Sequence, residues 1–288
     1  MYPPLVYLNG SFLPAEQAQV SCFDRGFLFA DGVYEVIPAY GGRLFRLPQH
    51  LARLDNSLAG IRLPNPLAAS AWQAVFTRLV EAGGGSDQSV YLQVTRGPAE
   101  RDHTFPTQIT PTVFAYSQPL KYPEPAQLAA GVAAITVPDI RWLRCDVKAI
   151  ALLPNVLMRQ QATEQDAAEA ILLRDGCMTE GSASNIFLVL SGTLVTPPKG
   201  PFILPGITRD LALELARAHG LALEERAVTE SELRDADELM LSSSTKELLP
   251  ITRLDGKPVG SGRPGPLHAR LHALYQDYIR DFRAGKVE

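Results

Sequence analysis

One lysine of this chain lies in a setting that favours chemistry over simple solvation. Lys148 follows Val147 and precedes the apolar run 149–153, whereas the remaining lysines lie in turns, in polar runs or in the C-terminal tail. An apolar environment disfavours the charged form of an amine, so a lysine placed there becomes a nucleophile toward aldehydes and can afterwards move a proton. The alternative is a lysine whose stem lies along apolar surface while its ammonium group reaches water. The spacing alone leaves both interpretations open.

Two further stretches have the composition of an anion-binding cradle. Gly206, Ile207 and Thr208 begin an expected helix, where unpaired backbone N–H groups, a hydroxyl and the helix dipole favour phosphate. Four hydroxyl residues at 242–245, Ser243 and Ser244 among them, end an expected strand and could complete the same cradle. Either stretch could instead be local capping, with Thr208 as a helix N-cap and the serine run closing a turn.

Glu180 lies in a polar segment, 178–185, that follows a turn at 174–176 and that we expect to be a loop between two strands. A carboxylate there is either an ordinary loop residue or the partner of a ring nitrogen, which it would hold protonated. His268 and His272 are spaced i, i+4 on the last expected helix and could share a metal, but no third ligand lies nearby. We therefore expect a solvated helix face and no metal site.

The composition and the missing motifs exclude several classes of function. The net charge is −4 and no basic cluster is interleaved with aromatic residues, so we expect no nucleic-acid partner. No run of about 18 apolar residues occurs, so we expect no membrane insertion, and the N-terminus does not predict secretion. Three widely spaced cysteines suit a reducing cytoplasm. The nucleotide-binding, zinc-protease and serine-hydrolase motifs are missing.

Local patterns predict an α+β protein of two domains, as the length of 288 residues also suggests. We expect a domain at 1–118, a proline-rich linker at 119–125 and a domain at 126–288. In the first domain, strands are expected at 5–8, 12–13, 33–40, 44–47, 89–96 and 112–116, and helices at 48–61 and 67–81. In the second, strands are expected at 131–137, 170–173, 186–190, 193–195, 221–226, 238–241 and 251–259, and helices at 156–169, from the start at 206–208 to 220, and at 267–282.

Five motifs follow one another along nearly the whole chain. They are Asp-Arg-Gly at 24–26 with Asp-Gly-Val-Tyr-Glu at 31–35, Gln-Val-Thr-Arg-Gly at 93–97, Asp-Ile-Arg-Trp-Leu-Arg-Cys-Asp-Val-Lys at 139–148, Thr-Glu-Gly-Ser at 179–182 with Ser-Asn at 184–185, and Gly-Ile-Thr-Arg-Asp at 206–210. In order and spacing they resemble the fold-type IV pyridoxal-phosphate enzymes, the class IV aminotransferases, and within them the D-amino-acid aminotransferases.

This resemblance implies a fold, a cofactor and a set of cofactor-binding residues. The fold would have a smaller N-terminal α+β domain and a larger C-terminal domain with a mostly antiparallel sheet or barrel, and the cofactor would be pyridoxal 5′-phosphate. Lys148 would form the Schiff base and Glu180 would face the pyridine nitrogen. The phosphate would be held by Arg53, Ile207, Thr208, Ser243 and Ser244, and Leu204 would pack against the ring. The resemblance also implies a homodimer.

The resemblance further implies a ping-pong transamination from a D-amino acid, such as D-alanine or D-glutamate, to a 2-oxo acid. Arg101 and His103 would bind the substrate carboxylate across the dimer interface, with the hydroxyl of Tyr34 adding a donor. From the residues alone, the loop that carries them could equally be solvated. Ala30 and Pro38 depart from the family, which often has glycine and, in D-specific members, lysine there. The preferred side chain of the substrate is therefore open.

Four other functions remain open on the same residues. An L-branched-chain aminotransferase would usually carry Tyr-Ile-Arg-Pro where this chain has Tyr-Leu-Gln-Val at 91–94, which argues against that activity. An (R)-amine transaminase and an aminodeoxychorismate-type lyase would use the same lysine. A pyridoxal-phosphate-binding module without turnover is the fourth, and the presence of both Lys148 and Glu180 argues against it.

Overall fold

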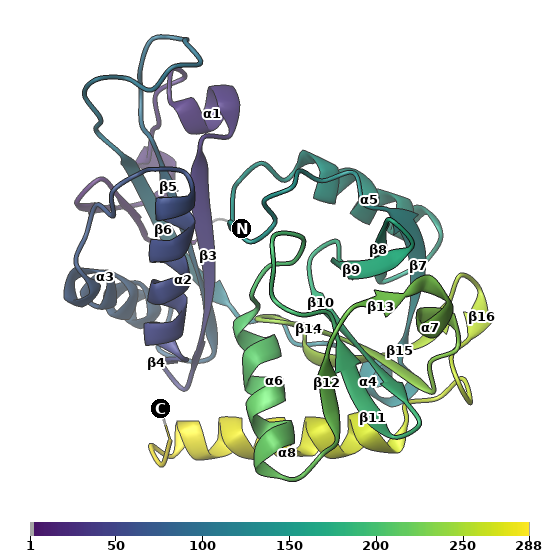
Figure 1. Cartoon of the computed structure of the whole chain (residues 1–288). Helices are drawn as coiled ribbons and strands as arrows, with labels where there is room; N and C mark the ends of the chain where they lie inside the picture. The colour runs from purple at the N-terminus through teal and green to yellow at the C-terminus, as the bar shows by residue number, and fades with distance from the viewer. Residues whose placement is uncertain (1–2, 288) are drawn as a thin grey trace. The chain divides into compact units, whose positions relative to one another are not determined.

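The structure is a computed structural model that describes residues 3–287. Contacts divide the chain into two compact units (Figure 1). Unit 1 contains the described residues through Leu120, the segment Val147–Ala151 and the C-terminal end from Asp281, and unit 2 contains Lys121–Asp146 and Leu152–Arg280. The expected domains were continuous stretches, whereas these contacts assign two later segments to unit 1. Among the described residues, no helix combines the length and apolarity needed to cross a bilayer.

Unit 1 is built on an antiparallel sheet with strand order β2-β1-β6-β5-β3-β4 in the described chain. Its elements are β1 (Val6–Leu8), β2 (Ser11–Leu13), η1 (Ala15–Gln17), α1 (Arg25–Phe29), β3 (Gly32–Tyr40), β4 (Arg43–Leu44), α2 (Leu47–Gly60), α3 (Ala69–Ala82), β5 (Gln88–Thr95) and β6 (Thr112–Pro119). The expected first hairpin is confirmed, because Asn9 and Gly10 both have the positive φ that a two-residue turn requires, 48° and 92°.

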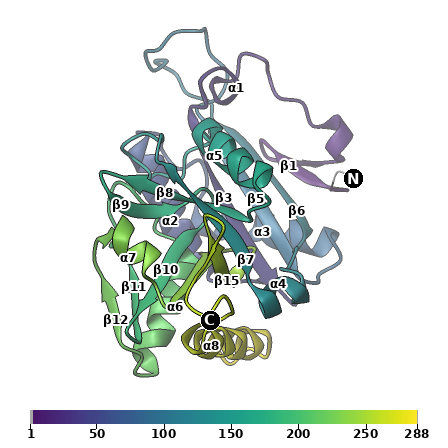
Figure 2. The ribbon, with the colours of Figure 1, turned by 90° about the vertical axis from the view of Figure 1, so that its right-hand side faces the viewer.

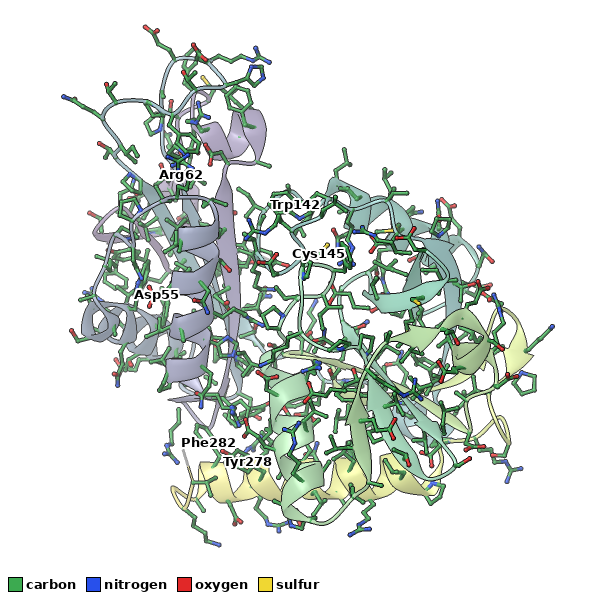
Figure 3. All side chains as sticks on the ribbon, viewed as in Figure 1. Asp55, Arg62, Trp142, Cys145, Tyr278 and Phe282 are labelled. Carbon is green, nitrogen blue, oxygen red and sulfur yellow. The ribbon has the colours of Figure 1, made fainter. Side chains whose placement is uncertain are left out.

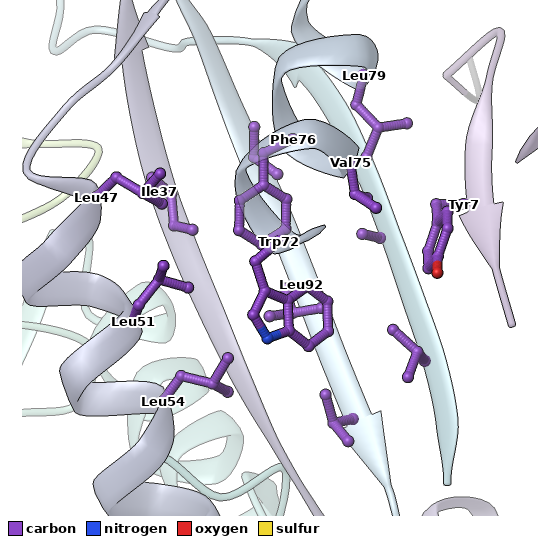
Figure 4. Packing of buried hydrophobic residues seen from close by; sticks show 14 of the residues in the cluster. Tyr7, Ile37, Leu47, Leu51, Leu54, Trp72, Val75, Phe76, Leu79 and Leu92 are labelled. Atoms are coloured by element: carbon purple, nitrogen blue, oxygen red, sulfur yellow. The ribbon is translucent and has the colours of Figure 1, made fainter. Parts of the chain in front are cut away.

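Helices α2 and α3 bury their apolar stripes on this sheet. Figure 4 shows Leu51 and Leu54 of α2 facing Trp72 and Phe76 of α3, with Leu92 of β5 beneath them. The pattern follows the helical period, so each helix presents one apolar face to the strands. Full burial of these side chains contributes about 1.5–3 kcal/mol each and fixes the position of α2 on β3.

The segment that carries Lys148 lies beside the N-terminal half of β3. The backbone N–H of Tyr34 donates to the Lys148 carbonyl at 3.0 Å, and the Ile150 N–H donates to the Gly32 carbonyl at 3.1 Å. An antiparallel bridge joins Val33 to Ala149 between them. These ladder contacts explain why Val147–Ala151 belongs to unit 1, although it is far from β3 in sequence.

Unit 2 contains a larger, mostly antiparallel sheet with the order β12-β11-β10-β14-β15-β7-β8-β9-β13, and β16 pairs with β15. The elements are α4 (Pro125–Ala130), β7 (Val132–Pro138), α5 (Leu153–Glu164), β8 (Glu169–Arg174), β9 (Cys177–Gly181), β10 (Asn185–Leu190), β11 (Thr193–Thr196), α6 (Ile207–Ala218), β12 (Leu223–Glu225), β13 (Val228–Thr229), α7 (Glu230–Arg234), β14 (Glu238–Ser243), β15 (Glu247–Leu254), β16 (Lys257–Pro258) and α8 (Pro266–Arg283). Described pairs β11/β12, β15/β7 and β7/β8 are parallel. The predicted fold class is confirmed.

Three local expectations were wrong. Most of β9 lies in the polar segment 178–185 that was expected to be a loop; β9 pairs with β8 and β13, so Glu180 lies on a strand. The short helix α1 lies in a stretch expected to be a loop, and α4 begins at the last residue of the expected linker and continues through 126–130, where no element was expected. His268 does not lie on a solvated face: it is 4% exposed, and its ring stacks on His272 with centroids 5.7 Å apart. Burial lowers the pKa of His268 to about 4.

Candidate active site

Lys148 is held in place through its backbone. Its N–H donates to Ser57 Oγ of α2 at 3.1 Å, and its carbonyl accepts from Tyr34 of β3. The side chain is half-buried, and Nζ lies 4.0 Å from the centroid of the Tyr34 ring. A cation over an aromatic face is attracted by the ring quadrupole, which orients the amine along one side of β3. The structure therefore brings Lys148 and Tyr34 together.

Arg53, which also lies on α2, forms a buried ion pair with Glu35 of β3. Its Nε donates to Glu35 Oε1 and its Nη2 donates to Glu35 Oε2, both at 2.8 Å. His50 Nδ1 lies 2.9 Å from Glu35 Oε2, and all three side chains are buried. Burial opposes ionisation of Glu35, but the Arg53 guanidinium outweighs it and lowers the pKa of Glu35 below its usual value. Glu35 thus orients the side chain that we expected to bind phosphate.

Arg101 and His103 lie in the long connection between β5 and β6, next to α1 (Figure 2). Both are exposed. The Arg101 guanidinium carbon lies 5.4 Å from the Phe29 ring centroid, and the His103 ring centroid also lies 5.4 Å from it. The two residues thus share one aromatic support at the end of α1, with their polar groups open to solvent.

In unit 2, Glu180 is buried and hydrogen-bonded on both oxygens. Oε2 accepts from Asn185 Nδ2 at 3.0 Å and from the Leu204 N–H at 2.9 Å, while Oε1 contacts Arg141 Nη1. Burial raises the pKa of Glu180 to about 7, against the opposing effect of Arg141. A carboxylate in such a site has a pKa near neutral pH, and Glu180 and Leu204 are direct neighbours.

A second carboxylate positions Arg141. Arg141 Nε donates to Asp139 Oδ1 and Arg141 Nη2 donates to Asp139 Oδ2, both at 2.9 Å, and Thr179 Oγ1 donates to Asp139 at 3.0 Å.

Cys145 anchors the loop that follows Arg141: its Sγ lies 3.3 Å from the Trp142 carbonyl (Figure 3). Burial raises the pKa of Cys145 to about 11, so this thiol remains protonated at neutral pH.

The start of α6 has the features of an anion site. Gly206 is the N-cap, and no side chain caps this end, so Thr208 is not the N-cap that one interpretation predicted. A Cβ at Gly206 would lie 2.0 Å from Asn185 Oδ1, so this close approach requires glycine. Ile207 and Thr208, the residues expected to bind phosphate, are buried in the first turn.

The hydroxyl run lies at the end of β14. Ser243 Oγ accepts from the Lys246 N–H at 3.1 Å, which is the turn-closing contact of the capping alternative. Ser244 follows in the turn. Ser242 Oγ is buried and has no hydrogen-bond partner within the described chain. An orphaned buried hydroxyl beside two further serines is consistent with a site that accepts an external polar group.

Several residues that shape the site were not identified in advance. Asp139, Arg141 and Asn185 lie within the motifs, but the sequence did not indicate that Arg141 and Asn185 contact Glu180 or that Asp139 binds Arg141. Glu35 lies in a motif, but nothing in the sequence indicated that it binds Arg53. Glu169 is 0% exposed and accepts from Ser184 Oγ at 2.8 Å, yet in sequence it is only an acidic residue before an apolar run.

Comparison with known proteins places the chain in a family. The model of the family described as amino-transferase class IV matches residues 32–254. The chain belongs to the class IV aminotransferases. The D-alanine aminotransferase of Bacillus licheniformis is 44% identical over 95% of this chain and 96% of its own. That of Staphylococcus aureus (strain MW2) is 39% identical over 95% and 97%.

A solved structure has the same fold. The branched-chain amino acid aminotransferase of Thermobaculum terrenum, solved in its PLP-bound holo form, has a TM-score of 0.84 and is 28% identical. The match covers 99% of this chain and 95% of that one. The predicted family is confirmed by the family model and by the D-alanine aminotransferase relatives, and the predicted fold by this structure. Class IV aminotransferases are pyridoxal-phosphate enzymes, and the chemical groups of this chain fit that cofactor: an amine, a buried carboxylate and an uncapped helix start, together with an unpaired buried hydroxyl.

Proposed function

We propose that this class IV aminotransferase moves the amino group of a D-amino acid, of the D-alanine or D-glutamate type, to a 2-oxo acid. The observation that carries the proposal is the 44% identity, over nearly the full length of both chains, to a D-alanine aminotransferase. Pyridoxal 5′-phosphate would be the cofactor, and the protein would act as a homodimer. We expect it in the cytoplasm.

Each cofactor-binding residue has a role that its surroundings support. When bound, the cofactor supplies an electron sink for the charge left at Cα when the α-proton departs. Lys148 would attach the cofactor through Nζ and then move that proton. Glu180 would hold a proton on the ring nitrogen, with Arg141 and Asn185 orienting its carboxylate. Leu204, whose N–H binds Glu180, would pack against the ring.

The phosphate would be bound by a helix start, a serine turn and one arginine. Ile207 and Thr208 would offer N–H donors at the uncapped start of α6, where the helix dipole favours an anion. Ser243 and Ser244 would add hydroxyls. Arg53 would add a fixed charge, and its bidentate pairing with Glu35 sets the plane of its guanidinium.

Substrate handedness would follow from three fixed points. Arg101 and His103, reaching across the dimer interface, and Tyr34 would bind the carboxylate. The cofactor would hold the nitrogen, and the hydrogen on Cα would face Lys148. An L-substrate held by the same carboxylate and nitrogen contacts would have its hydrogen and side chain exchanged, which turns the hydrogen away from the base.

An L-branched-chain activity is the second candidate, because structural neighbours such as the Thermobaculum terrenum enzyme bear that name. At 28% identity that likeness says little about the substrate, and the sequence 91–94 lacks the Arg-Pro pair typical of those enzymes. The (R)-amine transaminase and lyase alternatives share the same lysine and differ only in substrate or product.

One assay separates these functions. The purified holoenzyme is mixed separately with D- and L-alanine, D- and L-glutamate, L-leucine and an (R)-primary amine, each with 2-oxoglutarate or pyruvate, and the amino product is quantified by chiral chromatography. We expect turnover with the D-amino acids and a D-amino acid as product. Preference for L-glutamate or L-leucine would overturn the proposal, as would release of ammonia or an elimination product. Lys148→Ala is the control for background chemistry.

A further inference from the structure

The connection between β5 and β6, residues 96–111, is tied at both of its ends by one carboxylate. Asp24 accepts a hydrogen bond from Thr95 Oγ1 at 2.7 Å and from Thr112 Oγ1 at 2.6 Å. Asp24 is 1% exposed. Its two oxygens thus join the last residue of β5 to the first residue of β6, so the long loop starts from a fixed base.

The middle of this loop is held by Arg25, the first residue of α1. Arg25 Nη1 donates to the backbone carbonyl of Asp102 at 2.6 Å, and Arg25 Nε donates to Asp31 Oδ2 at 2.8 Å. Arg25 is 3% exposed, so a long charged side chain has been buried to make these two contacts. A hydrogen bond between a guanidinium and a carboxylate is about twice as strong as one between neutral groups. The bond to Asp31 therefore fixes the orientation of the Arg25 guanidinium, whose Nη1 binds the Asp102 carbonyl.

The same Asp31 carboxylate also binds Arg96, which contacts the loop at Phe105. Arg96 Nε and Nη2 donate to Asp31 Oδ2 and Oδ1 at 2.8 and 3.0 Å. The Arg96 guanidinium carbon lies 3.8 Å from the Phe105 ring centroid, and that of Arg62 lies 5.5 Å from it. Burial opposes ionisation of Asp31, but Arg96 and Arg25 lower its pKa below the usual value.

These contacts lie next to the two residues expected to bind the substrate carboxylate. Arg101 and His103 flank Asp102, whose carbonyl Arg25 holds, and both pack on Phe29, one helical turn after Arg25. The Arg25 guanidinium carbon itself lies 4.9 Å from the Phe29 ring centroid. Arg25 and Phe29 therefore form one rigid platform beneath the tip of an otherwise exposed loop.

We propose that Arg25 is a positioning residue for substrate recognition: by binding Asp31 and the Asp102 carbonyl, it holds Arg101 and His103 where they can meet a carboxylate. Arg25 acts only through the loop. This inference rests on the proposed roles of Arg101 and His103. Its prediction is that loss of Arg25 weakens binding of substrates that carry an α-carboxylate and leaves carboxylate-free amines little affected, because small displacements of a clamp reduce binding steeply.

The first test measures the loop itself, without any substrate. Backbone amide hydrogen exchange of residues 101–105 is compared between wild type, Arg25→Gln and Arg78→Gln. Arg78 is an exposed arginine of α3 whose guanidinium carbon lies 3.9 Å from the Phe12 ring centroid, so it matches the chemical change outside the platform. We expect exchange of the loop to rise at least about tenfold in Arg25→Gln alone. Equal exchange in all three proteins would overturn the inference.

The second test is kinetic. Arg25→Gln should raise KM for a D-amino acid about tenfold, with kcat changed far less, and should leave KM for an (R)-primary amine near the wild-type value. Arg25→Lys should recover part of the affinity, because it keeps the charge near Asp31 but lacks the fork. A loss of kcat with every donor would mean a general structural role and would overturn the inference.

Two further variants make every outcome decisive. If Arg101→Ala leaves KM for D-amino acids unchanged, the proposed carboxylate role fails. If Arg101→Ala raises KM and Arg25→Gln does not, the platform inference alone fails. If Arg25→Gln does not fold, Phe105→Ala replaces it, because Phe105 is 43% exposed and its loss frees the loop at the Arg96 contact. That variant should show the same two effects, and an unchanged exchange rate and KM would contradict the inference.

Discussion

Arg53 and Glu35 meet in a planar, two-pronged ion pair in which both bonds measure 2.8 Å and both side chains are buried. The pair links α2 to β3 through side chains, within the same unit that carries Lys148. Because removing one partner of a buried pair leaves an uncompensated charge, the two residues have a structural role that is separable from any contact with phosphate.

Arg53→Ala should therefore cause two losses. The apoprotein should lose about 3 kcal/mol of unfolding free energy, because Glu35 is left buried without its guanidinium partner. Cofactor retention after dialysis should fall far more than in Glu180→Gln, because a fixed charge on the phosphate is gone. The double variant Glu35→Gln/Arg53→Met separates the effects: it should recover much of the stability but not the cofactor. Full cofactor retention in the double variant would contradict the phosphate role.

Lys148→Ala should lower transamination by at least about 1,000-fold, because it removes both the group that attaches the cofactor and the group that moves the α-proton. Its matched control is Lys257→Ala, at the exposed start of β16 in unit 2, which should retain wild-type turnover. Initial rates with D-alanine and 2-oxoglutarate measure both. Near-normal turnover of Lys148→Ala would refute the central assignment.

Glu180→Gln should slow turnover without loss of cofactor, because the charge that favours a protonated ring nitrogen is removed. Loss of cofactor from this variant would instead indicate a structural role. Turnover and bound cofactor are measured on the same preparation.

The raised pKa of Glu180 also predicts a pH dependence of the apoprotein's stability. With a folded pKa of about 7 against an unfolded value of 4.5, the folded state binds the proton more tightly, so this contribution is complete below pH 4.5 and is lost as pH rises through 7. The full effect is about 3 kcal/mol. Urea unfolding of wild type and Glu180→Gln is measured from pH 4.5 to 8, and the unfolding free energy of the wild type should fall relative to that of Glu180→Gln as pH rises. A pH-independent difference would contradict the shift.

His268 predicts the opposite slope. Its folded pKa of about 4 lies below the unfolded value of 6.5, so the neutral ring's contribution is complete above pH 6.5 and is lost as pH falls toward 4. His268→Leu should remove this loss, which amounts to about 3 kcal/mol. The urea midpoint of the variant should consequently depend less on pH between 4 and 6.5, and an unchanged dependence would show that His268 does not titrate there.

Local determinants explain what could be predicted. The first hairpin could be predicted because Asn9 and Gly10 both accept the positive φ of its turn. Helix α2 could be predicted because Pro48 favours the first turn of a helix. Strand β9 was missed because Cys177–Gly181 is polar, and its strand conformation comes from pairing with β8 and β13 rather than from its own composition.

The contacts of the site were beyond local patterns. The carbonyl of Lys148 accepts from Tyr34, more than a hundred residues earlier, and such a ladder contact depends on the finished sheet. Arg141 lies near Asp139 in sequence, but its contact with Glu180 requires β9 to be folded. Glu169 is buried, and its carboxyl group is hydrogen-bonded by groups such as the Ser184 hydroxyl, which the folded chain brings to it.

The last prediction concerns Ala30, where the family often has glycine. Ala30 ends α1 in the left-handed conformation, with φ 55° and ψ 32°, immediately before Asp31. A residue with a Cβ pays about 1–2 kcal/mol in this region, whereas glycine adds about 0.4–1 kcal/mol of unfolded-state entropy. Because the strain is larger, Ala30→Gly should stabilise the apoprotein by about 0.5–1 kcal/mol in urea unfolding. Ala74→Gly, at an exposed position within α3, should instead destabilise by about 1 kcal/mol. Equal destabilisation by both changes would mean that Ala30 is not strained.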